Sequence, residues 1–458
     1  MRQEAEMRTE HGTEQKDGTK KIAVWKLTAG ILLAAGITVS GGCGSSGGES
    51  KAEQGNKSLS LCISESQYEE CKAGIEKYKT AYPDVELNVE TYSSSERPTR
   101  MKQLDTELMA GKGPDLLFME VWGSNDAYKM MKSGVFAPLD SFMEQDKEWD
   151  GADYVQAVLG AGTFDGKQMV MPLDYYATIA VASKEGMEKA GIAWDGGMDI
   201  LTFMQDAGRL YGQEDTVRVF ADVGQLAPFP EMLTGQFLDY EKGSLAVDAG
   251  RLREACEAYK FIFPEDNGSG DYPSSGDFGF GERIGSGEAY FHIANNFKTF
   301  IGVSAAVAAD AEPVFCPLTN DKGETLSKIS QYVGIRANSG NQKNAWNMIK
   351  LLLGDEVQSA IADRGFYCPV RKSSLEGAVE QAVEEETAYG SQYVKMGILP
   401  QTYIDAYKKV LMHPQKCYYA TDIYVRFMEE MTPFYEDEAS YEECMKKFEE
   451  YIKVYLTE

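Results

Sequence analysis

Apolar positions follow two alternating spacings along the first part of the chain after residue 57. The run SLSLCI at 58–63 has the short, apolar character of a buried strand, and apolar or aromatic residues then recur every three or four positions across 66–82. The first pattern predicts a strand and the second a helix, which we expect to end at Pro83. Apolar residues at alternate positions across 85–89 predict a second strand.

The same alternation continues to residue 133. Apolar residues at helical spacing across 101–108 are followed by the short apolar run 115–119 and by a helical pattern over 124–133. Strand, helix, strand, helix, strand is the order of an α/β sheet with helices on its faces. We therefore predict an α/β fold class.

The remainder of the chain is less regular. An Asp-Gly turn followed by extended chain is expected over 165–185, and the Gly-, Ser- and Pro-rich stretch 264–287 is expected to be largely loop. The other segments with a clear pattern are predicted strands or extended chain at 289–294 and 328–336, and predicted helices at 199–211, 249–262, 341–353 and 441–455. Trp346 has apolar neighbours on its helix, which indicates a core position.

The N-terminal segment has the composition of an export signal. Three lysines between residues 20 and 26 precede the apolar stretch 27–39, which is shorter than the about 20 residues that a membrane span needs. Cys43 follows small residues and precedes a Gly- and Ser-rich stretch, and this resembles a bacterial lipobox with a tether over 43–56. The resemblance implies removal of residues 1–42 and lipidation of Cys43 at the outer face of the cell membrane. An ordinary signal peptide or an uncleaved anchor is the alternative.

Net charge and size exclude some classes of protein. The chain of 458 residues has a net charge of −27, which disfavours nucleic acid and anionic membranes as partners. A hydrophobic content of 43% is ample for sizeable cores, and the part after residue 42 is long enough for two domains.

Cysteine, histidine and motif content argue against a cofactor, a metal site or catalysis. Seven cysteines besides Cys43 show no CxxC spacing and mostly lie in apolar patterns, so we expect buried free thiols, although Cys62 and Cys71 could pair. Only His292 and His413 follow residue 42, which disfavours a histidine-based zinc site. No GxSxG, HExxH or P-loop motif is present, so no catalytic residue is predicted.

Four stretches in order resemble the family 1 extracellular solute-binding proteins of ABC importers, a maltose-binding-protein-like family. They are YKTAYPDVELNVETY (78–92), the segment 101–142 with GKGPDLLFMEVWG and a later APL turn, FDGKQMVMPLDYYATIAVASKE (164–185), and the segment 332–373 from YVGIR to CPVRKS. The resemblance implies a non-enzymatic, monomeric protein that delivers a solute, most often a mono- or oligosaccharide, to a membrane permease.

The family resemblance also implies two α/β lobes, the periplasmic-binding-protein fold, joined by a hinge that the chain crosses several times. By analogy, the first lobe comprises residues 57–173 and 328–375, and the second comprises 174–327 and 376–458. Ligand would bind between the lobes and stabilise the closed state by its higher affinity for that state.

Candidate ligand residues are those that can stack on a sugar ring or bond its hydroxyl groups. They comprise Met119, Glu120 and Trp122 after a predicted strand, Asp174, Tyr175 and Tyr176 at the expected hinge, Asn295, Asn296 and Phe297 after another strand, Phe278 in the Gly-rich stretch, and Tyr418 and Tyr419 near the end. Packing for the aromatic residues and turn formation for the asparagines are the structural alternatives.

Two other functions remain open at this level. An anchored extracellular glycoside hydrolase would need two carboxylates about 5–10 Å apart, and acidic residues are plentiful. The same binding fold could instead take a peptide, a glycerophosphate or a polyamine, and Glu120 and Asp174 would suit a cation.

Overall fold

A computed structural model of the chain gives the arrangement of most residues after the predicted tether. It describes residues 57–120, 126–194, 196–211, 217–221, 229, 231–232, 238–239, 242, 244–266, 279–294, 296–384, 386–389, 392–395, 399–419, 421 and 423–457. Within these ranges, no helix is both long and apolar enough to cross a membrane. The segment 1–56, with the predicted signal, Cys43 and the tether, lies outside the described residues.

The first five-stranded sheet contains the early strands that the sequence predicted. In spatial order its strands are β2 (Glu86–Tyr92), β1 (Ser58–Ser64), β3 (Leu116–Glu120), β16 (Gln331–Ile335) and β6 (Met171–Pro172). Strand β1 runs parallel to β2 and β3, whereas β16 is antiparallel to β3. Helices α1 (Glu65–Ala81) and α12 (Gln342–Leu352) pack on this sheet, and α13 (Asp355–Arg364) packs on α1. The predicted alternation of strand and helix is confirmed.

The second five-stranded sheet is built from the middle of the chain. Its strands are β10 (Arg218–Phe220), β13 (Ala289–Ala294), β8 (Ile179–Ser183), β14 (Pro313–Thr319) and β9 (Met198–Asp199). It packs against α6 (Lys184–Ala190), α7 (Ile200–Tyr211), α10 (Phe280–Gly285) and α11 (Phe297–Val307), and α9 (Ala249–Asp266) packs on α7.

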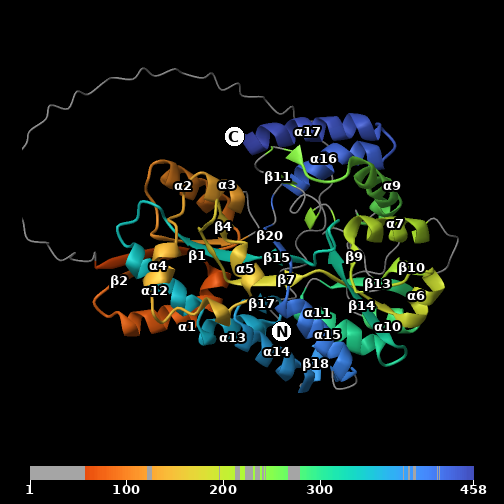
Figure 1. Ribbon diagram of the computed structural model, residues 1–458, viewed down its shortest axis with the longest axis horizontal. Coiled ribbons are helices and arrows are strands. Elements are labelled where there is room, and N and C mark those ends of the chain that lie inside the picture. Colours follow the sequence, from red (N-terminus) through yellow and green to blue (C-terminus); the bar gives the residue numbers. More distant parts are fainter. Residues whose placement is uncertain are drawn as a thin grey trace, which may run out of the picture. The chain divides into compact units, whose positions relative to one another are not determined.

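A third sheet connects the two, because the chain passes directly from one sheet into the next. Its strands are β17 (Cys368–Pro369), β7 (Asp174–Ala177), β15 (Leu326–Ile329) and β20 (Lys416–Tyr419). Only Leu173 separates β6 from β7, and only Ser330 separates β15 from β16. Figure 1 shows these strands between the elements of the first sheet and those of the second.

The remaining elements are short helices, hairpins and the C-terminal helices. They are α2 (Arg97–Met109), α3 (Ala127–Lys132), α4 (Asp140–Gln145), the 3-10 turn Gly151–Asp153, α5 (Gln156–Gly160), β4 (Thr163–Phe164), β5 (Lys167–Gln168), β11 (Leu238–Asp239), β12 (Ser244–Leu245), α14 (Lys372–Glu384), β18 (Glu386–Tyr389), β19 (Gln392–Lys395), α15 (Gln401–Met412), α16 (Ile423–Tyr435) and α17 (Tyr441–Thr457). The predicted Asp165-Gly166 turn joins β4 to β5, with φ of 50° and 71°.

The prediction of a largely loop structure over 264–287 is wrong for part of that stretch. Helix α9 extends to Asp266, and α10 occupies Phe280–Gly285, while 267–278 lies outside the described residues. Phe280 and Ile284, four positions apart, are both buried. A Cβ added to Gly281 would lie 2.4 Å from the Cβ of Ala306 on α11. The glycine therefore permits close packing of two helices rather than a turn.

Two apolar cores contain the residues that periodicity marked as buried. The expectation of buried free thiols is confirmed for all seven described cysteines. Trp346 is also buried as predicted, and its indole nitrogen donates a hydrogen bond to Asp146 at 2.9 Å.

Candidate functional site

The carboxyl ends of β1 and β3 bring three polar side chains together. Ser64 ends β1 and caps α1, Glu120 ends β3, and Arg97 begins α2. The Glu120 carboxylate accepts a hydrogen bond from the Ser64 hydroxyl and forms an ion pair with Arg97. Because parallel strands end at the same sheet edge, this cluster lies where α/β proteins place ligands.

Glu120 was predicted to accept hydrogen bonds from sugar hydroxyl groups, and this stays a prediction. In the structure its negative charge is balanced by Arg97, which sequence reasoning did not single out. Arg97 stands in the polar stretch SSSERP, which carries no apolar period to reveal its position. Met119 is buried, and its carbonyl accepts a hydrogen bond from Gln67 at 3.3 Å.

Asp174 and Tyr175 are fully buried where the first sheet meets the connecting sheet. One carboxylate oxygen of Asp174 accepts hydrogen bonds from the backbone N–H groups of Ser330 (3.2 Å) and Gln331 (2.8 Å). Burial raises the pKa of Asp174 well above its usual range, and the nearby Glu70 adds to the effect. The Tyr175 hydroxyl donates to the Leu411 carbonyl at 2.6 Å. Both side chains thus join strands and helices of the protein itself.

Tyr176 is half-buried and lies among groups from three segments. Its ring stacks on Tyr367, with centroids 6.0 Å apart and planes 25° apart. The ammonium of Lys328 lies 5.5 Å from the Tyr176 ring centroid and also forms an ion pair with Glu231. Burial lowers the pKa of Lys328, and the Glu231 carboxylate opposes that shift. Of these four residues, the sequence analysis had selected only Tyr176 as a candidate.

Asn296 and Phe297 form the start of α11. The Asn296 side chain caps this helix by accepting the N–H of Thr299 at 2.8 Å, so it has a structural role here. Phe297 is buried and stacks on Tyr407 at 6.2 Å. The N–H of Lys298 donates to the Gly365 carbonyl at 3.0 Å, which places this helix start near the segment that carries Tyr367.

Tyr418 and Tyr419 lie in apolar cores, with 1% of each exposed. The Tyr419 ring packs edge-on against Tyr332 at 4.9 Å and Tyr128 at 5.5 Å. The packing alternative therefore describes both residues in this structure. Trp122, Phe278 and Asn295 lie outside the described residues, so their predicted roles stay predictions.

Hydrogen bonding links part of the predicted set into one region. Gln331 pairs with Glu120 across β16 and β3, and its N–H binds Asp174, two residues before Tyr176. The Gln331 backbone therefore links Glu120 in the first sheet to Asp174 in the connecting sheet, on the strand that also carries Tyr176. Among the described residues, no group of three or more His, Cys, Asp or Glu side chains could hold a metal ion.

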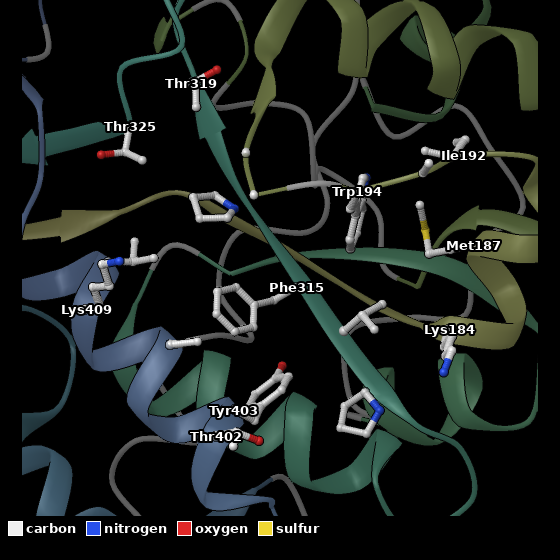
Figure 2. Close-up of a pocket in the computed structure, with 18 of the residues that line it drawn as sticks. Lys184, Met187, Ile192, Trp194, Phe315, Thr319, Thr325, Thr402, Tyr403 and Lys409 are labelled. Atoms are coloured by element: carbon white, nitrogen blue, oxygen red, sulfur yellow. The ribbon is translucent and has the colours of Figure 1, made fainter.

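A separate groove of about 1060 Å³ lies beside β14 and is drawn in Figure 2. It is lined by residues of α6 and the segment after it, β14, the turn before β15, and α15. None of the predicted ligand residues lines it. Sequence reasoning missed this groove because its lining comes from distant segments without a shared motif.

A protein-family model and several solved structures resemble the chain. The model described as bacterial extracellular solute-binding protein matches residues 73–389. Among curated proteins, none matches the sequence significantly.

Three of the similar solved structures come from different bacteria. The sugar-binding protein MalE from Xanthomonas citri has a TM-score of 0.58 at 13% identity, covering 87% of this chain and 97% of that one. An ABC substrate-binding protein from Listeria monocytogenes in complex with cycloalternan has a TM-score of 0.54 at 15% identity, covering 87% and 99%. The cyclic alpha-maltosyl-1,6-maltose binding protein from Arthrobacter globiformis has a TM-score of 0.54 at 15% identity, covering 87% and 98%. At these identities the likeness shows a shared two-lobed fold.

Proposed function

Because this chain belongs to the bacterial extracellular solute-binding proteins, we propose that it captures a neutral mono- or oligosaccharide and delivers it to an ABC permease. The observation that carries the proposal is the half-buried Tyr176–Tyr367 stack, which the Gln331 backbone links through Asp174 and Glu120 to the polar edge cluster of Ser64, Arg97 and Glu120. Aromatic faces cover the C–H surfaces of a sugar, while paired polar side chains exchange hydrogen bonds with its hydroxyl groups.

The charges in this region favour a neutral ligand over a cation or a phosphate. Glu120 is paired with Arg97, and Lys328 is paired with Glu231. Asp174 is fully buried, with its pKa raised by burial. A polyamine would find no free carboxylate among these residues. A glycerophosphate would have to displace a carboxylate from Arg97 or Lys328, which would leave a charge unpaired.

The similar structures support the same ligand class. They include a sugar-binding protein, a substrate-binding protein in complex with cycloalternan and a cyclic alpha-maltosyl-1,6-maltose binding protein. The family and these neighbours are binding proteins. We extend this to the present chain by proposing that it returns its sugar intact, in contrast to a glycoside hydrolase.

The lobe boundaries and the anchor complete the proposal. We assign residues 57–173 and 328–375 to one lobe and residues 174–327 and 376–458 to the other, with closure about the short connections at Leu173 and Ser330. The protein would act as a monomer held at the outer face of the membrane by lipid on Cys43. Mass spectrometry of membrane-extracted protein tests the anchor, and an unmodified Cys43 would contradict it.

Thermal unfolding in the presence of candidate ligands tests the proposed function. A binding sugar at 100 times its dissociation constant should stabilise the protein by about 2.7 kcal/mol, and the sugar should be recovered unchanged. We expect Tyr176→Ala and Tyr367→Ala to weaken binding at least tenfold, because each removes one ring of the stack.

The control is Tyr451→Ala, which removes a partly buried ring on α17 that packs on Tyr455 instead. This variant should bind the sugar as the unaltered protein does. Stabilisation by spermidine or a glycerophosphodiester, with none by any sugar, would refute the carbohydrate assignment while leaving the family assignment intact. Release of a shortened sugar would favour the hydrolase.

A further inference from the structure

The groove beside β14 brings aromatic side chains from separate segments to one open surface. Phe315 lies on β14, Tyr403 on α15 and Trp194 on the segment after α6. Figure 2 shows the Phe315 and Tyr403 rings next to each other in the groove. Their centroids are 4.9 Å apart with planes at 80°, and all three side chains are half-buried. Each aromatic residue therefore keeps part of its surface open.

The backbone side of β14 that faces away from β8 has few hydrogen-bond donors. The N–H of Lys184 donates to Glu312 and that of Leu318 to Thr178, so even-numbered residues of β14 hold the hydrogen bonds to β8. In an antiparallel pair, the backbone groups of the intervening residues point to the other side. Those residues are Pro313, Phe315 and Pro317.

Two of these three outward positions are prolines, which have no N–H group. Strand β9 pairs with β14 only at Leu318 and Thr319, so before that point this side of β14 has the single N–H of Phe315. Pro313 and Pro317 are buried, whereas Phe315 is half-buried. Prolines on an edge strand oppose the addition of another strand. An extended peptide that adds as a further strand is therefore a poor occupant of this groove.

The remaining lining combines apolar side chains, such as Met187, Ile192 and Val410, with charged groups of both signs. Two lysines, Lys184 and Lys409, face two glutamates, Glu188 and Glu312, so their charges cancel, and Lys184 is paired with Glu312 at 2.9 Å. Hydroxyl groups of Thr319, Thr325 and Thr402 also line the groove. A balanced lining favours a neutral ligand over an ionic one, because an ionic ligand would leave one pair of charges uncompensated.

We propose that this groove is a second binding site, for a neutral oligosaccharide, separate from the region around Tyr176. The half-buried rings stack on the sugar, and the hydroxyl groups of Thr325 and Thr402 bind its hydroxyl groups. The volume of about 1060 Å³ suits an oligosaccharide better than a single sugar. The site would hold part of a glycan at the outside of the protein. This inference does not depend on the proposed function of the Tyr176 region.

Isothermal titration calorimetry of the purified protein with maltotetraose, cellotetraose and xylotetraose tests the proposal. At least one sugar should bind in a phase that Phe315→Leu and Thr402→Glu each weaken at least tenfold. Phe315→Leu removes the ring while nearly preserving volume, and Thr402→Glu places a charge at an exposed position without disturbing the core. Tyr176→Ala should leave this phase unchanged.

The matched control is Phe261→Leu, which alters an exposed phenylalanine on α9 outside the groove lining. It should change neither phase. Equal binding by Phe315→Leu, Thr402→Glu and the unaltered protein would overturn the proposal, as would the absence of binding by all three sugars outside the Tyr176-dependent phase. Loss of the Tyr176-dependent phase alone would instead bear on the proposed function.

Discussion

Asp115 beside the first five-stranded sheet and His292 in the second are both buried, but they differ in their hydrogen bonding. Next to the first sheet, the buried Asp115 accepts hydrogen bonds from Ser60, Ser339 and Asn341, at distances of 2.7–3.1 Å. In the second sheet, His292 is fully buried, and neither ring nitrogen has a partner among the described residues. Its ring stacks on Phe280 at 4.9 Å.

This difference shows which forces fix the two parts. Asp115 joins β1, the start of β3 and the segment before α12, so directional hydrogen bonds set their relative positions. Burial alone would raise the pKa of Asp115, but hydrogen bonds from Ser339, Ser60 and Asn341 lower it below its usual range. Around the second sheet, the rings of Phe203, Phe220 and Phe291 pack on one another. The burial of His292 has a desolvation cost that no hydrogen bond among the described residues offsets.

The largest expected effect comes from breaking the Asp115 network. Asp115→Ala leaves several buried donors without an acceptor, and we expect a loss of about 3–5 kcal/mol in the free energy of unfolding. Urea unfolding measures this loss. The control Asp84→Ala alters an exposed aspartate and should change stability by less than about 0.5 kcal/mol. Equal losses of stability in the two variants would show that the Asp115 hydrogen bonds do not hold these segments together.

A smaller loss in the free energy of unfolding is expected when the pH is lowered, because the second sheet contains His292. Burial lowers the pKa of His292 to about 3, from an ordinary value of 6.5. The unfolded chain therefore binds a proton that the folded protein excludes, so stability present above pH 6.5 is lost as the pH falls toward 3. Between pH 7 and pH 5 this contribution amounts to about 2 kcal/mol.

The variant His292→Phe isolates that contribution. It keeps an aromatic ring beside Phe280 and removes the titrating group. The difference in unfolding free energy between this variant and the unaltered protein should grow by about 2 kcal/mol from pH 7 to pH 5. A difference independent of pH would show that His292 reaches a partner or solvent.

The smallest effect concerns one hydrogen bond between the connecting sheet and α15. Tyr175→Phe removes the donor to the Leu411 carbonyl and should cost about 1 kcal/mol. Tyr78→Phe is the matched control, since the buried Tyr78 hydroxyl has no partner among the described residues. Its removal should cost nothing or stabilise slightly. Thermal unfolding compares the two, and a larger loss for Tyr78→Phe would reverse the assignment.

The sequence predicted an element correctly where the spacing of apolar residues within that segment determined its structure. Periodicity located β1, α1, β2 and β3 because each buries one face or lies wholly in the core. Periodicity could not predict that Asp174 and Tyr175 are buried while Tyr176 is only half-buried. The burial of each of these side chains depends on the distant strands that pair with β7 on either side.

Partners of the candidate site were harder to predict than its location. The edge after β3 followed from the rule for parallel strands, and Glu120 lies there as expected. Arg97, Tyr367 and Lys328 reach the region from segments 23 or more positions away in the sequence, and no local pattern marks them. Side-chain pairing across such distances is a property of the tertiary structure alone.

The seven buried thiols carry a consequence for how the protein matures. Burial raises the pKa of each of them, so the folded protein holds them as unreactive thiols. An unfolded chain arriving outside the cell would expose all seven to oxidants at once. Collapse of the two cores must then be faster than oxidation, since any disulfide formed earlier would join cysteines that the native structure keeps unpaired. The yield of correctly folded extracellular protein should therefore depend on the rate of folding relative to the rate of thiol oxidation.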